Sequence, residues 1–178
     1  KENTYVATDD FQIKNLVESY GFNVVMTSED CLTGTDRVFE FSKKIDADIY
    51  MNIQGDEPLL DFNEILKIAK VKVNNFNYVV NGMCGFTYDE NPNNINIPKV
   101  IFTEDKRLIY ASRKALPGFK EKINTPTNYY KQVCIYAFSR EELLDYGNYG
   151  KKSNLENAED IEIVRFFEVF EIFDFLNF

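Results

Sequence analysis

The sequence predicts an α/β protein with a mostly parallel sheet in its first half and an antiparallel, strand-rich second half. Residues 1–75 alternate short apolar segments with segments of helical periodicity, the pattern of a parallel sheet covered by helices. Residues 76–178 begin instead with longer extended segments separated by polar turns. The chain has 178 residues, the size of one domain, and 44% of them are hydrophobic, enough for a core.

The boundaries of the first-half elements follow from capping and stop residues. Asp10 and its neighbours can cap a helix, Gly21 ends it, and Asp61 with Glu64 forms a capping-box pattern. In order, we expect a strand at 4–7, a helix at 11–20, a strand at 22–26, a helix at 36–44, a strand at 49–53 and a helix from 61 to about 73.

The second half is expected to contain a hairpin and two helices. The hairpin turns at 104–106, one helix begins at Ser139, and Ser153 with Glu156 caps a longer helix that reaches about Glu168. We expect extended segments at 78–86, 99–103, 107–111 and 129–138, a polar loop at 87–96 and an apolar, strand-like segment at 169–178.

Composition excludes several classes of function. The net charge of −9 argues against a nucleic-acid partner, because such binding depends on clustered Lys and Arg. The chain has no histidine, so a His base, a Ser-His-Asp triad and a His-ligated zinc are excluded. Cys31, Cys84 and Cys134 are widely spaced, which indicates reduced thiols in the cytoplasm. No apolar stretch approaches the roughly 18 residues that span a bilayer, so no membrane partner is expected.

Polar clusters follow the predicted strands of the first half, at 8–10, 27–36 and 54–58. In parallel sheets, ligands bind at the carboxyl ends of the strands. The third cluster, Gln-Gly-Asp-Glu-Pro, places Asp56 and Glu57 directly after an apolar strand, where a carboxylate can hold Mg²⁺ on nucleotide phosphates. An ordinary polar turn is the alternative interpretation.

Two further motifs have a binding interpretation and a simpler one. Residues 33–37 open a helix with Gly34, which suits an anion or nucleotide, but Thr35 or Asp36 could act only as a helix cap with Arg37 exposed. Arg113 follows a predicted strand, and its planar guanidinium suits the carboxylate of a sugar acid, although a solvated turn charge is commoner.

Charged residues recur every three positions near the end of the chain. They are Glu156, Glu159, Glu162 and Arg165. This spacing is typical of a solvated helix face with local ion pairs, and it could also line one wall of a sugar pocket.

Six segments occur in an order and at intervals that match one enzyme family: Val6–Asp10, Val25–Ser28, Gly34–Arg37, Gln54–Pro58, Ser112–Arg113 and Ile135–Phe138. With these segments the sequence resembles the 3-deoxy-manno-octulosonate cytidylyltransferases, or CMP-Kdo synthetases, over essentially the whole chain. The resemblance implies a Rossmann-like three-layer fold of the nucleotide-diphospho-sugar-transferase type. It also implies transfer of CMP from CTP to a 3-deoxy-2-keto sugar acid, with Mg²⁺ and release of pyrophosphate.

The resemblance also implies roles for residues and regions. Residues 1–75 would form the nucleotide-binding half of the single domain 1–178, and residues 76–178 the sugar-binding half that also forms a homodimer. Asp56 would be catalytic and a metal ligand, and Arg113 would be catalytic and bind the sugar acid. The nucleotide would contact Gly34, Thr35, Arg37 and Gln54, and the sugar Arg113, Gln132, Tyr136, Glu156 and Glu159.

The sequence departs from this family at both ends and at one site residue. Gln132 stands where the family usually has His. The family's first strand, which carries a lysine that grips the triphosphate, is missing from this sequence, and we expect its place to be between the strands at 4–7 and 49–53. The family's second metal-binding aspartate is expected beyond the last residue of this sequence. The 178-residue polypeptide alone is therefore expected to be poorly soluble and to make no CMP-sugar. The alternatives are a sialic-acid-type synthetase and a non-catalytic nucleotide- or sugar-binding fragment.

Overall fold

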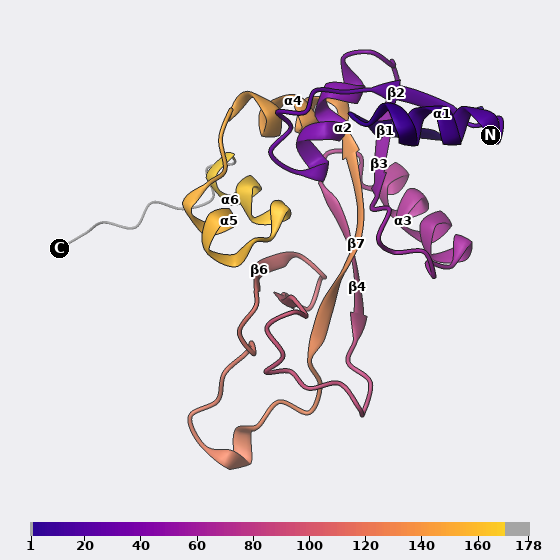
Figure 1. Cartoon of the computed structure of the whole chain (residues 1–178). Coiled ribbons are helices and arrows are strands. Elements are labelled where there is room, and N and C mark those ends of the chain that lie inside the picture. The colour runs from indigo at the N-terminus through magenta and orange to yellow at the C-terminus, as the bar shows by residue number, and fades with distance from the viewer. Residues whose placement is uncertain (1, 170–178) are drawn as a thin grey trace.

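The structure is a computed structural model that describes residues 2–169 (Figure 1). Strands and helices alternate in the first half, and strands predominate from residue 80 to residue 139. The elements are β1 (Tyr5–Thr8), α1 (Phe11–Ser19), β2 (Asn23–Met26), α2 (Gly34–Ser42), β3 (Ile49–Ile53), α3 (Phe62–Asn74), β4 (Val80–Gly85), β5 (Lys99–Phe102), β6 (Leu108–Ser112), the 3₁₀ helix η1 (Lys122–Asn124), β7 (Tyr130–Ser139), α4 (Arg140–Asn148), α5 (Asn154–Glu159), the 3₁₀ helix η2 (Glu162–Arg165) and α6 (Phe166–Val169).

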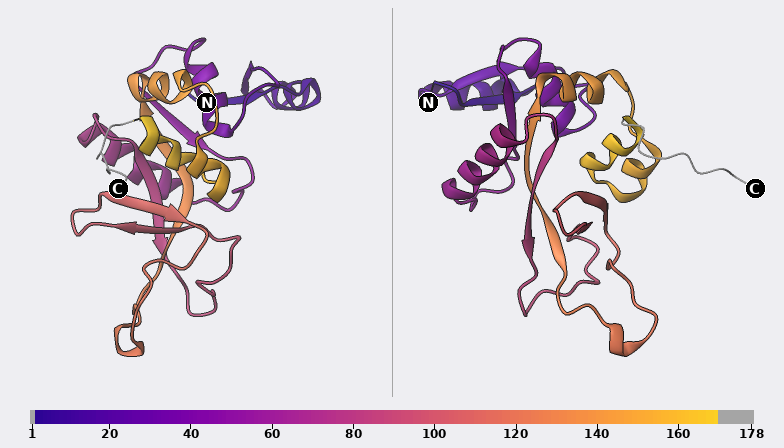
Figure 2. Two further views of the ribbon diagram at one scale, coloured as in Figure 1. Left: turned by 90° about the vertical axis from the view of Figure 1, so that its left-hand side faces the viewer. Right: turned by 180° about the vertical axis from the view of Figure 1, so that it is seen from behind.

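The strands form two sheets. β1 and β2 pair in parallel, whereas the second sheet has the order β3-β7-β5-β6 with β4 also paired to β7, and all its pairings are antiparallel. Within residues 2–169, parallel pairing is thus confined to β1 and β2, and β3 joins β7 rather than β1. The ten-residue β7 runs lengthwise through the molecule beside β4 (Figures 1 and 2).

The expected helix boundaries need two corrections. α2 begins at Gly34 rather than at residue 36, because the Thr33 side chain caps it by accepting from the amide of Asp36. The helix expected from 153 to about 168 is broken after α5, where Asp160 has a left-handed backbone with φ of 50°. The segment expected as a strand at 169–178 lies, beyond Val169, outside the described residues.

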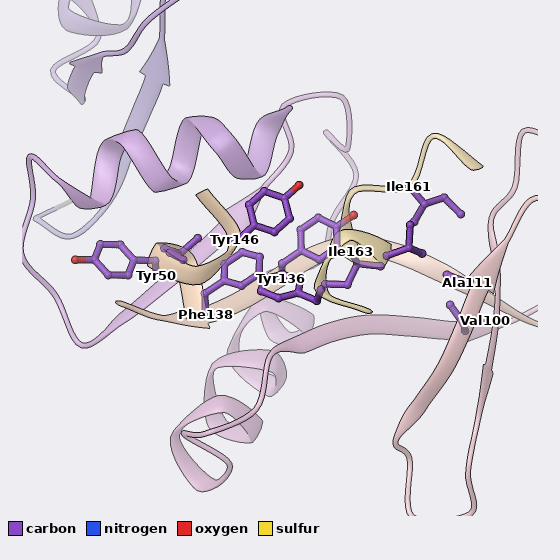
Figure 3. Close-up of a cluster of buried hydrophobic side chains, with 11 residues drawn as sticks. Tyr50, Val100, Ala111, Tyr136, Phe138, Tyr146, Ile161 and Ile163 are labelled. Carbon is purple, nitrogen blue, oxygen red and sulfur yellow. The ribbon is translucent and has the colours of Figure 1, made fainter. Parts of the chain in front are cut away.

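Aromatic side chains build the core at one end of β7 (Figure 3). Phe138 of β7 is fully buried and stacks on Phe166 with ring centroids 5.8 Å apart. Tyr146 of α4 contacts the same Phe166 ring at 5.0 Å. Burial of each such ring contributes roughly 1.5–3 kcal/mol. Phe166 therefore anchors the α5–α6 segment on β7 and α4.

Candidate active site

A cavity of about 740 Å³ lies between β7, the segment after β3, the loop before β5 and the α5–η2 turn. This volume falls within the range of small-molecule sites in proteins. The lining residues are Leu32, Thr33, Gln54, Asp56, Glu57, Cys84, Glu90, Asn96, Ile97, Pro98, Arg113, Lys131, Gln132, Val133, Cys134, Tyr136, Lys152, Glu156, Asp160, Ile161 and Glu162.

Strand β7 supplies one wall of this cavity. Gln132, Cys134 and Tyr136 line it from alternate positions of the strand, and the neighbouring Lys131 and Val133 line it as well. The Gln132 amide donates to Asn81 Oδ1 at 3.1 Å and to the Tyr136 hydroxyl at 3.2 Å. Burial raises the pKa of Tyr136, so its hydroxyl stays protonated at neutral pH. The structure thus brings the two expected sugar contacts Gln132 and Tyr136 together on one polar wall.

The N-terminus of α2 holds the carboxylate of Glu162. Gly34 N and Thr35 N donate to its two oxygens at 3.1 and 2.9 Å, the Thr35 hydroxyl donates at 2.6 Å, and Gln54 Nε2 at 3.2 Å. The free amides and dipole of a helix N-terminus favour an anion. Of the expected nucleotide ligands, Gln54 lines the cavity, whereas Gly34 and Thr35 do not. Gly34 and Thr35 thus differ from the expectation, because their backbone amides donate to the Glu162 carboxylate rather than facing the cavity.

Close approach of β3 explains the glycine at this helix start. A Cβ at Gly34 would lie 3.3 Å from Glu162 Oε1 and 3.6 Å from Asn52 Nδ2. Asn52 is 6% exposed, and its Nδ2 has no acceptor among the residues that the structure describes. Asn52 thus places a buried, unused donor beside the helix start, which the Glu162 carboxylate occupies.

A buried ion cluster anchors η2, the helix that carries Glu162, to α2 and α5. Arg165 is fully buried and contacts Glu156 at 2.7 Å through two nitrogens, and Asp36 at 2.7 and 2.9 Å. Its guanidinium carbon lies 3.9 Å from the centre of the Tyr146 ring. Burial disfavours the cation, but the two carboxylates outweigh it and raise the pKa of Arg165. The solvated-face interpretation of these charges is therefore wrong: the break at Asp160 turns them inward.

Arg113 and Glu159 bind each other's segments. Arg113 donates to the carbonyls of Glu159 at 2.5 Å, Ile95 at 3.1 Å and Asp160 at 2.9 Å. The Glu159 carboxylate accepts from the Arg113 amide at 2.8 Å and from Ser112 Oγ at 2.7 Å. Burial opposes ionisation of Glu159, yet these bonds lower its pKa. Glu159 is thus a structural clamp outside the cavity lining, while Arg113 lines the cavity with its nitrogens already bonded to carbonyls.

Asp56 and Glu57 present exposed carboxylates to the cavity. Neither carboxylate makes a hydrogen bond or ion pair in the described part of the chain. Residues 2–169 contain no group of three or more His, Cys, Asp or Glu side chains placed to hold a metal. The residues nevertheless fit Mg²⁺, which is typically bound by one or two carboxylates together with substrate phosphates.

Arg37 differs from the expectation, since it does not line the cavity. Its Nη1 donates to Thr27 Oγ1 at 2.6 Å, and its Nη2 pairs with Asp9 at 3.3 Å. Arg37 therefore ties α2 to the ends of β1 and β2. It is also not the exposed charge of the simpler interpretation.

Most cavity residues were absent from the contacts that the resemblance implied, among them Glu162, Lys131, Lys152 and Cys134. The alternation of β7 could have added Cys134 between Gln132 and Tyr136. The remaining three depend on contacts between distant segments, which the sequence pattern does not show.

The fold is of the Rossmann-like α/β type found in nucleotidyltransferases. The structure matches a CMP:2-keto-3-deoxy-manno-octonic acid synthetase complexed with CTP, with a TM-score of 0.83, 30% identity, and coverage of 92% of this chain and 67% of that one. The model of the cytidylyltransferase family matches residues 1–172. The chain belongs to the cytidylyltransferase family.

Curated relatives carry more specific names. The chain is 37% identical over 145 residues to a 3-deoxy-manno-octulosonate cytidylyltransferase of Francisella tularensis subsp. novicida, covering 75% of this chain and 56% of that protein. It is 35% identical over 143 residues to an 8-amino-3,8-dideoxy-manno-octulosonate cytidylyltransferase of Shewanella pealeana, covering 77% and 57%. The chain thus spans little more than half the length of these relatives. Among residues 2–169, no helix has the length and apolarity needed to cross a membrane.

Proposed function

We propose that the protein carrying this chain transfers CMP from CTP to 3-deoxy-manno-octulosonate (Kdo) or a close relative, with release of pyrophosphate. The observation that carries the proposal is the cavity of about 740 Å³, which presents the free carboxylates of Asp56 and Glu57 together with the paired polar groups of Gln132 and Tyr136. The family match and the names of the relatives support the same reaction. A homodimer in the cytoplasm, formed through residues 76–178, serving lipopolysaccharide or capsule synthesis, is part of this proposal.

The reaction assigns separate tasks to the two ends of the cavity. The anomeric hydroxyl of the sugar attacks the α-phosphorus of CTP and loses its proton to solvent. The new oxygen–phosphorus bond forms as the bond from the α-phosphorus to the bridging oxygen of the β-phosphate breaks, and pyrophosphate leaves. Mg²⁺ held by Asp56 would neutralise charge on the phosphates. Gln132 and Tyr136 would orient sugar hydroxyls in complementary ways. Both N–H groups of the Gln132 amide are engaged, so Gln132 offers Oε1 as an acceptor, whereas the Tyr136 hydroxyl, which accepts from Gln132, offers its proton as a donor.

Glu162 and the α2 amides position the nucleotide half against the sugar half. Glu162 lies in η2, while its partners Thr35 and Gln54 belong to the first half of the chain. This contact joins segments more than 100 residues apart and sets the width of the cavity between them. Gly34 and Thr35 would therefore affect nucleotide binding indirectly, by holding the Glu162 carboxylate in place.

Pyrophosphate release by the full-length gene product tests the proposal. Kdo, 8-amino-Kdo and a sialic acid are each supplied with CTP, and the eight-amino sugar is included because of the Shewanella relative's name. Turnover with Kdo or 8-amino-Kdo is expected, and turnover only with the sialic acid, or with none, rejects the proposal.

Asp56→Asn tests the metal assignment in the same assay. Because loss of a main electrostatic group typically costs about 10²- to 10³-fold in kcat, we expect at least a hundredfold loss at saturating Mg²⁺. Asp105→Asn is the matched control, since Asp105 is an exposed turn residue outside the cavity lining. Near-normal turnover of the Asp56 variant would exclude Asp56 as the metal ligand.

A further inference from the structure

The cations that line the cavity differ in how far the protein already satisfies them. In the described part of the chain they are Arg113, Lys131 and Lys152. A sugar acid brings one carboxylate, which needs a positively charged donor that is free to bind it. The internal partners of each cation therefore decide which one is available.

Two of the three cations are already engaged. The ammonium group of Lys131 is paired with the Glu90 carboxylate, and this pairing lowers the pKa of Glu90. Arg113 bonds to three backbone carbonyls through Nε, Nη1 and Nη2. A substrate carboxylate at Lys131 would compete with Glu90 for the same charge, and at Arg113 only two of the five N–H groups are left unbonded by these carbonyls.

Lys152 differs because its ammonium group has no hydrogen-bond acceptor among residues 2–169. Its nearest carboxylate oxygen, Asp160 Oδ1, lies 3.8 Å away, beyond hydrogen-bond distance, and the Asp160 side chain is 78% exposed. The other nearby carboxylates are occupied, since Glu156 pairs with Arg165 and Glu162 with the α2 amides.

The Lys152 side chain is itself largely buried, with 30% of its surface exposed. Its charge is therefore held at the cavity rather than free in solvent, and a partner there is less screened than on an open surface. By contrast, the segment after β3 lines the cavity with two negative charges, the carboxylates of Asp56 and Glu57. The cavity thus offers exposed carboxylates after β3, which suit a metal, and a separate ammonium group at Lys152, which suits an acid.

We propose that Lys152 binds the carboxylate of the sugar acid, with Arg113 positioning the α5–η2 turn beside it. This inference rests on the proposed function and names the group that reads the acid. It replaces Arg113 as the carboxylate ligand: Arg113 shapes the site through the carbonyls of Glu159 and Asp160.

The test uses the full-length gene product with Lys152→Met, Lys152→Arg and the neighbouring Lys151→Met. Lys151 is the matched control, because it is exposed, packs near the Tyr149 ring and does not line the cavity. Two readouts are measured: the KM values for Kdo and CTP, and direct calorimetric binding of Kdo and of its C1 methyl ester without CTP.

Charge-assisted hydrogen bonds predict a clear pattern. Lys152→Met should raise the KM for Kdo about 10- to 100-fold and leave the KM for CTP within about twofold. Wild type should bind Kdo more tightly than its ester, and Lys152→Met should bind both equally. Lys152→Arg should restore most of the preference, and Lys151→Met should behave as wild type.

The outcomes separate this inference from the proposed function. Turnover with an unchanged Kdo KM in Lys152→Met, an equal rise in the CTP KM, or a retained preference for the acid over its ester overturns the Lys152 assignment alone. Absence of turnover with Lys152-dependent Kdo binding overturns the proposed reaction and leaves the carboxylate site standing. Absence of both turnover and Kdo binding in wild type overturns both.

Discussion

Replacing Arg165 by Met should strongly destabilise the protein. The Arg165 side chain is fully buried, and its removal would leave Glu156 and Asp36, whose side chains are 1% and 13% exposed, as uncompensated charges. Breaking a buried pair in this way costs about 3–5 kcal/mol. With an m value of about 2 kcal/mol/M, the urea midpoint should fall by about 1.5–2.5 M.

Equilibrium urea unfolding followed by circular dichroism measures this effect. Arg107→Met is the matched control, since Arg107 is 74% exposed and its change should cost less than about 0.5 kcal/mol. Adding Glu156→Gln to Arg165→Met should recover part of the loss, because it removes one buried charge. A loss below about 1 kcal/mol for Arg165→Met, or no recovery in the double variant, would refute the reasoning.

Three further perturbations have defined outcomes. Gly147→Ala places a Cβ 2.1 Å from Phe39 Cδ1, so the free energy of unfolding should fall by about 1–3 kcal/mol, as measured by thermal unfolding. Adding Phe39→Leu should relieve the clash, and an unchanged melting temperature for Gly147→Ala would contradict the packing of α4 on α2. The pKa of Glu159 is lowered in the folded protein, so its ionised carboxylate stabilises the fold above about pH 4.5, and this stability is lost as the pH falls through the folded pKa. Glu159→Gln should therefore make the free energy of unfolding less dependent on pH in the acid range, and equal slopes for the variant and the wild type would reject this. Gln132→His should change the kcat/KM ratio between Kdo and 8-amino-Kdo, and an identical ratio means that Gln132 does not distinguish these sugars.

The sequence pattern predicted the elements because their signals are local. Caps such as Asp10 and Ser153, and the apolar strand before Asp56, depend only on near neighbours. The Rossmann-like α/β fold class predicted from the sequence is confirmed, and so is membership of the cytidylyltransferase family, which the resemblance implied.

The features that the sequence did not predict are set by distant contacts. Nothing between 153 and 168 resembles a helix stop, yet the chain turns at Asp160, where Arg113 donates to the carbonyl of a residue 47 positions away. This turn buries Arg165 and brings Glu162 to α2. In the same way, β3 pairs with β7 through a register that no local periodicity specifies.

The length of β7 has a consequence for local opening of the protein. β3 flanks its residues Ile135–Ser139 and β4 its residues Tyr130–Ala137, so the middle of this strand is bonded on both edges. Amides there should exchange with deuterium only through global unfolding. Cys134 and Tyr136 lie in or beside this stretch and also line the cavity. The β7 wall of the cavity should therefore keep its shape during any local opening elsewhere in the protein.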